Sequence, residues 1–310
     1  MSEPIISVRE VWFRYSKHQE WVLKGVSLDV FRGEFIGIIG ETGAGKTTLA
    51  KHLNGLLKPA KGVVLVFGKD TRKTPTSKLA RYVGYLFQNP DSQIYSATIR
   101  DELSVSLRKL GFRDSEIEER IKWALDGVDL RKPLDMSPHI LSFGERHRLA
   151  IATLLAVKPD VFVLDEPFAG IDYKRSLQLL QVFKELTNRG HTVILITHDL
   201  QLLAELATRV VFMRGGSILR DSKPEDVIGD VEFLQEHNYT PLQVTVIGAG
   251  IGLGRLIRVL DLVKELEKRL QLQASLSTPS RCCRDPLPQQ PYNTSTAPLL
   301  ISLAAQGLSL

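Results

Sequence analysis

The sequence is poor in cysteine and lacks a long hydrophobic run. Its two cysteines, Cys282 and Cys283, are neighbours, and an adjacent pair makes neither a disulfide framework nor a zinc site. No run of about 20 apolar residues is present that would form a membrane-spanning helix. The start, MSEPIISVRE, lacks the basic and apolar segments of a secretory leader. We therefore expect a cytoplasmic protein with reduced thiols.

A strong excess of one charge is also missing. The 310 residues contain 40 Lys and Arg against 35 Asp and Glu, a net charge of +5. This balance permits anionic partners such as nucleotides without requiring one. Hydrophobic residues make up 43% and charged residues 24% of the chain, proportions typical of soluble globular proteins. The length predicts about two domains, or one large domain with an appendage.

Short apolar segments alternate with helical patterns between residues 35 and 213. This alternation predicts an α/β fold built on a parallel sheet, to which a β-rich N-terminal layer and a helical insert at about 91–157 are added. The last two strands flank Gly215-Gly216, a hairpin signal. The hydrophobic pattern predicts strands at 5–15, 22–30, 35–40, 63–67, 82–87, 161–164, 192–197, 210–213 and 217–219.

Capping residues predict where several helices begin. Ser115 with Glu118 makes a capping box ahead of an amphipathic stretch. Another helix is expected at about 142–157. Asp172 is a candidate N-cap for a helix at 173–188.

The composition changes near residue 230. Residues 255–273 predict a helix, whereas the following residues are rich in Ser, Thr, Pro and Gln and predict disorder. We therefore expect an α/β domain at 1–229, a helical extension at 230–274 and a disordered tail at 275–310.

The segment IGAGIGLG at 247–254 suggests a dinucleotide-binding fingerprint but fails its spacing. Leu253 and Arg255 stand where the last glycine is needed. We expect a flexible strand or turn that leads into the last helix.

The sequence GETGAGKT at 40–47 matches the phosphate-binding pattern G-x-x-x-x-G-K-[ST], between a buried strand and a helix. The glycines let successive backbone N–H groups face phosphate oxygens, and the helix N-terminus adds its positive end. Lys46 is expected at the β- and γ-phosphates and the Thr47 hydroxyl on Mg²⁺. The residues expected to bind ATP are Gly40, Glu41, Thr42, Gly43, Ala44, Gly45, Lys46, Thr47 and Thr48.

An acidic pair follows the apolar strand at 161–164. Asp165 and Glu166 lie at its carboxyl end, where open α/β sheets bind ligands. Asp165 is expected to hold Mg²⁺ directly or through water, and Glu166 to activate or orient the attacking water. Such a pair is often only a helix cap or a solvated edge, but together with the phosphate-binding loop it predicts a P-loop NTPase.

Further motifs narrow the family. Residues 141–152, LSFGERHRLAIA, resemble the LSGGQ signature of ABC ATPases and lie just before the acidic pair. The resemblance covers about residues 5–225. It implies that Ser142 and Gly144 meet the γ-phosphate bound by a partner subunit. Four single residues match other motifs of that family: Tyr15 (adenine stacking), Gln88 (Q-loop, at the metal), Asp172 (D-loop) and His198 (switch histidine, at the γ-phosphate).

Each of these residues also has a plain structural interpretation. Tyr15 could be a half-buried strand residue, Gln88 a surface amide and Ser142 only a helix cap. Two positions depart from the family pattern: Phe143 replaces the first signature glycine and Glu145 the glutamine. Since a glutamate near phosphates is unfavourable, Glu145 is expected to point away from them.

The segment FQNPDSQIYSATIRDEL, which contains Gln88, resembles the cobalt, nickel and energy-coupling-factor importer ATPases, which carry a C-terminal helical extension. The resemblance implies two ATP molecules between the subunits of a head-to-tail dimer, made with itself or a paralogous ATPase. It also implies a membrane scaffold and a substrate-binding subunit for metal ions or vitamins, at the cytoplasmic face of the cell membrane. Ile94, Tyr95 and Ile99 are expected to line the groove where the scaffold docks, unless they pack in the core of the insert.

Three alternatives stay open. The chain could serve an ABC exporter, or it could be a soluble ABC ATPase acting on ribosomes or nucleic acid. The absence of a basic tract and of a long coiled-coil insert disfavours nucleic acid as a partner. A nucleotide-binding module without turnover is disfavoured because Glu166 and His198 are both present.

Overall fold

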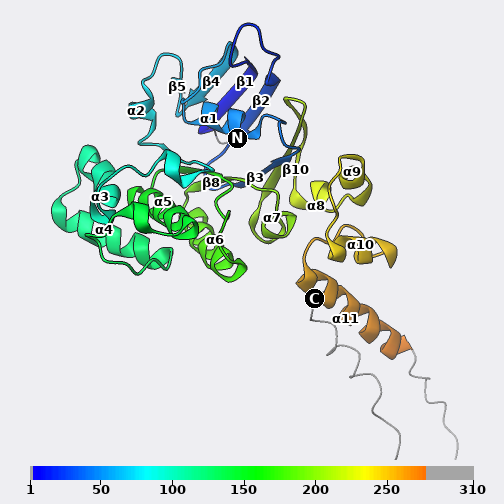
Figure 1. Ribbon diagram of the computed structural model, residues 1–310. Helices are drawn as coiled ribbons and strands as arrows, with labels where there is room; N and C mark the ends of the chain where they lie inside the picture. Colours follow the sequence, from blue (N-terminus) through cyan, green and yellow to red (C-terminus); the bar gives the residue numbers. More distant parts are fainter. Residues whose placement is uncertain (1–2, 277–310) are drawn as a thin grey trace, which may run out of the picture. The chain divides into compact units, whose positions relative to one another are not determined.

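The computed structural model describes residues 3–276 (Figure 1). Residues up to Leu266 form one compact unit, and a second begins at Glu267. Cys282, Cys283 and residues 277–310 of the predicted tail lie outside the described residues. Residues 275 and 276, which the sequence assigned to the tail, belong to the last helix instead.

The expected β-rich N-terminal layer is a four-stranded antiparallel sheet with the order β2-β1-β4-β5. Ile6 in the first strand pairs with Val30 on one side and Val66 on the other. The strands are β1 (Ile6–Phe13), β2 (Leu23–Val30), β4 (Lys61–Val66) and β5 (Lys69–Asp70).

The second sheet has six strands in the order β10-β9-β3-β8-β7-β6. All neighbours in it run parallel except β9 and β10, which form the predicted hairpin. The strands β6, β7, β8 and β3 run in the same direction. Their carboxyl ends therefore lie along one edge of the sheet. The strands are β3 (Phe35–Gly40), β6 (Val83–Leu86), β7 (Val161–Asp165), β8 (Thr192–Ile196), β9 (Arg209–Arg214) and β10 (Ser217–Ser222).

Each face of the parallel sheet packs into a different hydrophobic core. Ile36 and Ile38 of β3 pack with the antiparallel sheet and α1 (Lys46–Leu53). Phe35 and Ile39 face the opposite core, which is made largely of helices. Strands buried on both faces read as continuous apolar runs, which is why β3, β7 and β8 could be predicted as strands.

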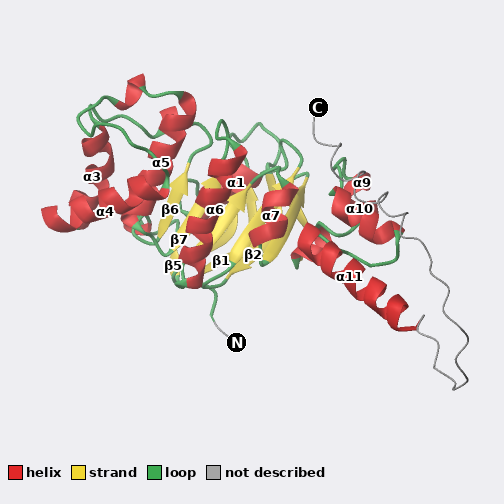
Figure 2. Cartoon of the chain, turned by 90° about the horizontal axis from the view of Figure 1, so that it is seen from below, coloured by secondary structure: helices red, strands yellow, loops and turns green. Residues whose placement is uncertain are grey.

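Helices cover the sheet and form the insert, and Figure 2 shows α6 and α7 lying over the strands. The predicted insert is made of α3, α4 and α5, and α5 and α6 begin where their caps indicated. The bounds are α2 (Thr76–Leu79), α3 (Ile99–Leu110), α4 (Asp114–Gly127), α5 (Phe143–Val157), α6 (Tyr173–Asn188) and α7 (Leu200–Leu206), with 3-10 turns at Pro90–Ser92 and Pro138–Ile140.

The predicted capping box of Ser115 and Glu118 is wrong. The helix α4 begins two residues earlier, where Glu116 accepts a hydrogen bond from the N–H of Arg113 at 2.9 Å. Glu118 instead forms an ion pair with Arg100 of α3. The carboxylate that caps the helix is therefore the one three residues after the true N-cap position.

The segment after residue 223 is helical and begins before the extension expected at 230–274. It contains α8 (Pro224–Val227), α9 (Val231–Glu236), α10 (Gln243–Gly250) and α11 (Val259–Leu276). The expectation of a strand or turn at 247–254 is wrong in its first half, because 247–250 belong to α10. No helix within residues 3–276 has the length and hydropathy of a membrane span.

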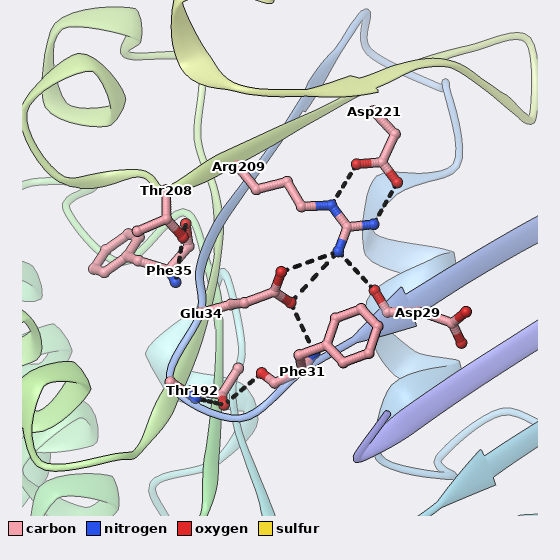
Figure 3. Close-up of polar contacts among 9 residues, drawn as sticks. Asp29, Phe31, Glu34, Phe35, Thr192, Thr208, Arg209 and Asp221 are labelled. Atoms are coloured by element: carbon pink, nitrogen blue, oxygen red, sulfur yellow. Dashed lines mark hydrogen bonds and ion pairs between the residues drawn. The ribbon is translucent and has the colours of Figure 1, made fainter. Parts of the chain in front are cut away.

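A polar cluster around Arg209 joins the two sheets at the edge where β3 begins (Figure 3). The guanidinium of Arg209 bonds both carboxylate oxygens of Asp221 and lies 3.2 Å from Glu34 Oε1. It also donates to the carbonyl oxygen of Asp29 in β2 at 2.9 Å. The carboxylate of Asp221, and secondly that of Glu34, raise the pKa of Arg209. Burial of the guanidinium lowers this pKa, but by less. One side chain thus ties β9 to β10, β2 and the start of β3.

Replacing Arg209 with methionine is expected to destabilise the protein by about 2–4 kcal/mol, because two poorly exposed carboxylates lose their partner. Urea unfolding measures the effect as a lower midpoint with an unchanged slope. Arg113→Met is the control: its side chain is 80% exposed, and a surface ion pair contributes at most about 1 kcal/mol. Equal stability of the two variants would contradict a joining role for Arg209.

Candidate nucleotide-binding site

The phosphate-binding loop takes the backbone conformation that its glycines permit. Gly40, Gly43 and Gly45 all have positive φ values, of 147°, 84° and 97°. A Cβ on Gly40 would lie 2.1 Å from the carbonyl oxygen of Met213 in the neighbouring strand β9. Glycine is therefore required where β3 ends, and the chain enters α1 at Lys46 with Gly45 as its N-cap.

Lys46 folds back over its own loop. Its ammonium donates to the carbonyl oxygens of Gly40 at 2.6 Å and Glu41 at 2.9 Å. The residue is buried, and burial lowers the pKa of Lys46, against the effect of the carboxylates of Glu166 and Asp165. The loop thus holds a cation beside a row of backbone N–H groups, an arrangement suited to a polyphosphate.

The acidic pair lies at the carboxyl end of β7. Asp165 is 2% exposed and accepts a hydrogen bond from the Tyr85 hydroxyl at 2.9 Å. Glu166 has a left-handed backbone (φ 50°), and its N–H donates to the carbonyl oxygen of Ile196 in β8 at 3.0 Å. Burial, and secondly Asp165, raise the pKa of Glu166 to about 7. A carboxylate with a pKa near neutrality is suited to accept a proton at physiological pH.

His198 follows β8 and faces the acidic pair. Its Nε2 lies 3.1 Å from Glu166 Oε1, a buried oxygen with no hydrogen bond among the described residues. Burial, and secondly Lys46, lower the pKa of His198. The ring is therefore neutral at physiological pH and can carry its proton on either nitrogen.

These groups line one cleft of about 230 Å³ at the carboxyl ends of β3, β6, β7 and β8. The sequence predicted that Lys46 and His198 meet here, although they lie 152 positions apart. The Thr47 hydroxyl and the Asp165 carboxylate supply oxygen donors of the kind that Mg²⁺ prefers. The residues that line the cleft are Val22, Thr42, Gly43, Gly45, Lys46, Thr47, Thr48, Gln88, Asp165, Glu166, Ile196 and His198.

Tyr15 stands beside this cleft rather than in its lining. Its side chain is 56% exposed, and its hydroxyl lies 3.0 Å from Oγ1 of Thr48 in α1. Phe13, two residues earlier, is 8% exposed and packs in the core. An exposed ring tied to the helix of the phosphate-binding loop is available for stacking on a base.

The signature segment forms the N-terminus of α5, outside the lining of the cleft. Ser142 is the N-cap and accepts a hydrogen bond from the N–H of Glu145. A Cβ on Gly144 would lie 2.5 Å from the carbonyl oxygen of Gly170, so this glycine permits close packing on the loop after Glu166. Phe143, which replaces a signature glycine, is 43% exposed.

Glu145 and Asp172 both cap helices. Glu145 accepts a hydrogen bond from the Ser142 N–H at 2.9 Å and pairs with Lys132 at 2.9 Å. These two contacts, Lys132 first, lower the pKa of Glu145 to about 2. The Glu145 carboxylate is thus engaged by the cap of α5 and by Lys132.

Asp172 accepts a hydrogen bond from the Arg175 N–H at 3.0 Å and caps α6, as predicted.

The segment after Gln88 corrects the docking prediction. Ile94 and Ile99 are 4% and 1% exposed and belong to the core of the insert, so they line no external groove. Tyr95 is 71% exposed. Arg146 of α5 lies 2.8 Å from Asp91 and ties this segment to the helix that follows the signature.

Two tyrosines at the site were missed by the sequence analysis. Tyr85 donates to Asp165, and the Tyr239 hydroxyl accepts a hydrogen bond from the N–H of Gly40 at 2.8 Å. Tyr85 lies in a predicted strand, β6, which pairs with β7. This position was a weak indication that its side chain could reach Asp165. Tyr239 lies 199 residues after Gly40, and no local pattern indicated the contact.

Comparison with known proteins identifies the family. The family model described as ABC transporter matches residues 23–169. The energy-coupling factor transporter ATP-binding protein EcfA of Methanocaldococcus jannaschii is 36% identical over 267 residues, which cover 86% of this chain and 90% of that protein. The chain belongs to the ABC transporter ATP-binding proteins.

The relatives of this ABC protein differ in length. A putative ABC transporter ATP-binding protein of Caldanaerobacter subterraneus is 42% identical over 248 residues, which cover 80% of this chain and 43% of the relative. The chain thus spans less than half the length of several relatives that it matches.

Solved structures share the ABC ATPase fold. The structure of cbiO1 from Clostridium perfringens, described as part of the ABC transporter complex cbiONQ, is 31% identical with a TM-score of 0.66, over 81% of this chain and 100% of that chain. A dimeric ATP-binding cassette bound to ADP and phosphate is 26% identical with a TM-score of 0.65, over 71% of this chain and 98% of that chain. The fold expected from the sequence is thereby confirmed.

Proposed function

We propose that this chain is a Mg²⁺-dependent ATP hydrolase that supplies energy to a membrane ABC transporter. The observation that carries the proposal is one cleft in which Lys46 and Thr47 meet Asp165, Glu166 and His198. This set combines phosphate-binding donors, oxygen donors for a metal and a candidate base. It is the combination that phosphoryl transfer to water requires.

The phosphate-binding loop is proposed to bind the triphosphate. Backbone N–H groups between Gly40 and Thr47 receive the β-phosphate at the N-terminus of α1. The Lys46 ammonium, already held at the loop by two carbonyl oxygens, contacts the β- and γ-phosphates. Tyr15 stacks on the adenine.

Mg²⁺ fits the donors on one side of the cleft. Thr47, Asp165 and Gln88 would hold it: all three line the cleft, and each carries a side-chain oxygen of the kind that Mg²⁺ prefers. When bound, the metal neutralises charge on the phosphate oxygens. The Tyr85 hydroxyl orients Asp165 by donating to one of its oxygens.

Glu166 is proposed to accept a proton from the attacking water. Its pKa of about 7 leaves a substantial fraction ionised at neutral pH, and Oε1 has no hydrogen-bond partner among the described residues. His198, 3.1 Å from that oxygen, is neutral and can donate a hydrogen bond to the γ-phosphate. Glu166 directly follows β7, and His198 comes two residues after β8.

The working unit is proposed to be a head-to-tail dimer, made with itself or a paralogous ATPase. Ser142 and Gly144 do not line the cleft of their own chain, and the N-terminus of a helix such as α5 presents backbone N–H groups suited to a phosphate. In the dimer this end of α5 meets the γ-phosphate bound by the partner, and Asp172 lies nearby. A dimeric cassette bound to ADP and phosphate is among the similar structures.

The transported substrate is proposed to be a metal ion or vitamin taken up by an importer. Similarity to EcfA and to cbiO1 supports this assignment over an exporter or a soluble ABC ATPase acting on ribosomes or nucleic acid. The partners are then a membrane scaffold and a substrate-binding subunit, with this chain at the cytoplasmic face of the cell membrane. The exposed Tyr95, in the segment after Gln88, is the apolar group that remains available to the scaffold.

Phosphate release from Mg²⁺-ATP by the purified chain tests the proposed activity. Hydrolysis is expected with Mg²⁺ and is lost with EDTA, because the metal neutralises the phosphate charge. Lys46→Ala should abolish it, whereas Lys122→Ala, at an exposed position on α4, should retain it. Hydrolysis by Lys46→Ala at the wild-type rate would place the activity elsewhere or in a contaminant.

A further inference from the structure

The segment after residue 230 packs against the strand next to the phosphate-binding loop. The centroid of the Phe212 ring in β9 lies 4.9 Å from that of Phe233 in α9 and 5.5 Å from that of Tyr239. β9 pairs in parallel with β3, and Met213 stands opposite Gly40. The aromatic cluster therefore fixes the turn after α9 beside the end of β3.

This turn contacts the first two residues of the loop. The Tyr239 hydroxyl accepts a hydrogen bond from the N–H of Gly40 at 2.8 Å. The neighbouring Asn238, in a left-handed conformation with a φ of 58°, directs its amide at Glu41 Oε1, 3.5 Å away. Burial raises the pKa of Tyr239, and the carboxylates of Glu166 and Glu41 raise it further, against the hydrogen bond from Gly40. The hydroxyl is thus neutral at physiological pH.

Gly40 is held on both sides. Its N–H bonds Tyr239, and its carbonyl oxygen accepts the Lys46 ammonium at 2.6 Å. Its φ of 147° and the Met213 carbonyl oxygen leave little freedom for its backbone. The orientation of this one residue sets where the loop begins and where Lys46 is anchored.

We propose that Tyr239 is a positioning residue of the nucleotide site, which holds Gly40 in the ATP-binding conformation and couples the segment after residue 230 to ATP affinity. The inference rests on the ATP-binding function proposed above. Tyr239 itself is proposed to touch neither phosphate nor metal. It acts through the backbone of the loop.

Loss of the hydroxyl is expected to weaken ATP binding without slowing the chemical step. Tyr239→Phe keeps the ring against Phe212 but leaves the Gly40 N–H without a partner, which disfavours the binding conformation. The apparent affinity for ATP falls in proportion to the fraction of molecules whose loop is in the binding conformation. We expect Kd and KM for Mg²⁺-ATP to rise about 5–10-fold, with kcat changed less than about twofold.

The control is Tyr82→Phe. The Tyr82 ring is also half-buried and stacks on Phe67 with centroids 4.9 Å apart, but its hydroxyl makes no hydrogen bond within residues 3–276. Both variants are compared with the wild type by equilibrium ATP binding, steady-state kinetics and thermal unfolding. Amide hydrogen exchange of residues 40–46 in nucleotide-free protein should be faster in Tyr239→Phe alone.

The outcomes separate this inference from the proposed function. Wild-type Kd and wild-type exchange at 40–46 in Tyr239→Phe would overturn the positioning role. A general loss of stability with kcat and KM both impaired would assign Tyr239 to folding alone and overturn it as well. If the wild-type chain binds no ATP, both the proposed function and the coupling of this segment to ATP affinity are refuted. Faster exchange at 40–46 in Tyr239→Phe would then still show that Tyr239 restrains the loop.

Discussion

Glu166→Gln is expected to lower the rate of ATP hydrolysis by about 10²–10⁴-fold while ATP binding is retained. The amide has nearly the same shape but cannot accept the proton of the attacking water. Within residues 3–276 Glu166 Oε1 is buried and accepts no hydrogen bond, and an amide at this position keeps the contact with His198 Nε2, 3.1 Å away, so the substitution removes mainly the base. Phosphate release and equilibrium ATP binding measure the two effects separately.

The same variant should accumulate as an ATP-bound dimer, since closure depends on binding and reopening on hydrolysis. Light scattering with and without Mg²⁺-ATP detects it as a doubling of mass. Glu118→Gln, which changes an exposed carboxylate on α4, is the matched control and should behave like the wild type. Hydrolysis at the wild-type rate by Glu166→Gln would remove Glu166 from the role of base.

Mixing two inactive variants should restore part of the activity. Lys46→Ala removes the phosphate-binding cation, and Ser142→Arg blocks the end of α5. In a head-to-tail dimer each site takes Lys46 from one chain and Ser142 from the other. A mixed dimer therefore contains one site with both defects and one intact site.

Random mixing in equal amounts makes half of the dimers mixed, so about a quarter of the wild-type sites are restored if the two sites act independently. Phosphate release at several mixing ratios should peak near equal amounts. Each variant mixed with itself is the control. Absence of recovery at every ratio would argue that Ser142 does not act across the dimer.

Local sequence signals predicted the parts of the fold and site that depend on neighbouring residues. Ser142 and Asp172 are N-caps because their side chains accept N–H groups three residues ahead. The loop at 40–47 was predictable because each of its three glycines has the positive φ that glycine adopts readily. The apolar runs before Asp165 and Thr197 were predictable as strands because both of their faces are buried.

Predictions failed where distant contacts decide the outcome. Ile94 and Ile99 were assigned to an outer groove, yet they pack in a core that their local sequence does not reveal. Glycines at 247–254 suggested a turn, but Gly248 is buried in α10, where a Cβ would lie 3.4 Å from Leu256. The bond between Tyr239 and Gly40 had no local signal at all.

A structure of Glu166→Gln with Mg²⁺-ATP is the sharpest test of the proposed ATP-bound dimer. We predict a dimer with two ATP molecules, each held by Lys46 and Thr47 of one chain and by Ser142 and Gly144 of the other. Mg²⁺ should lie on the side of Thr47 and Asp165. A nucleotide outside the cleft at Lys46, or one bound without any contact from the α5 N-terminus of a second chain, would contradict the proposed site and its dimer.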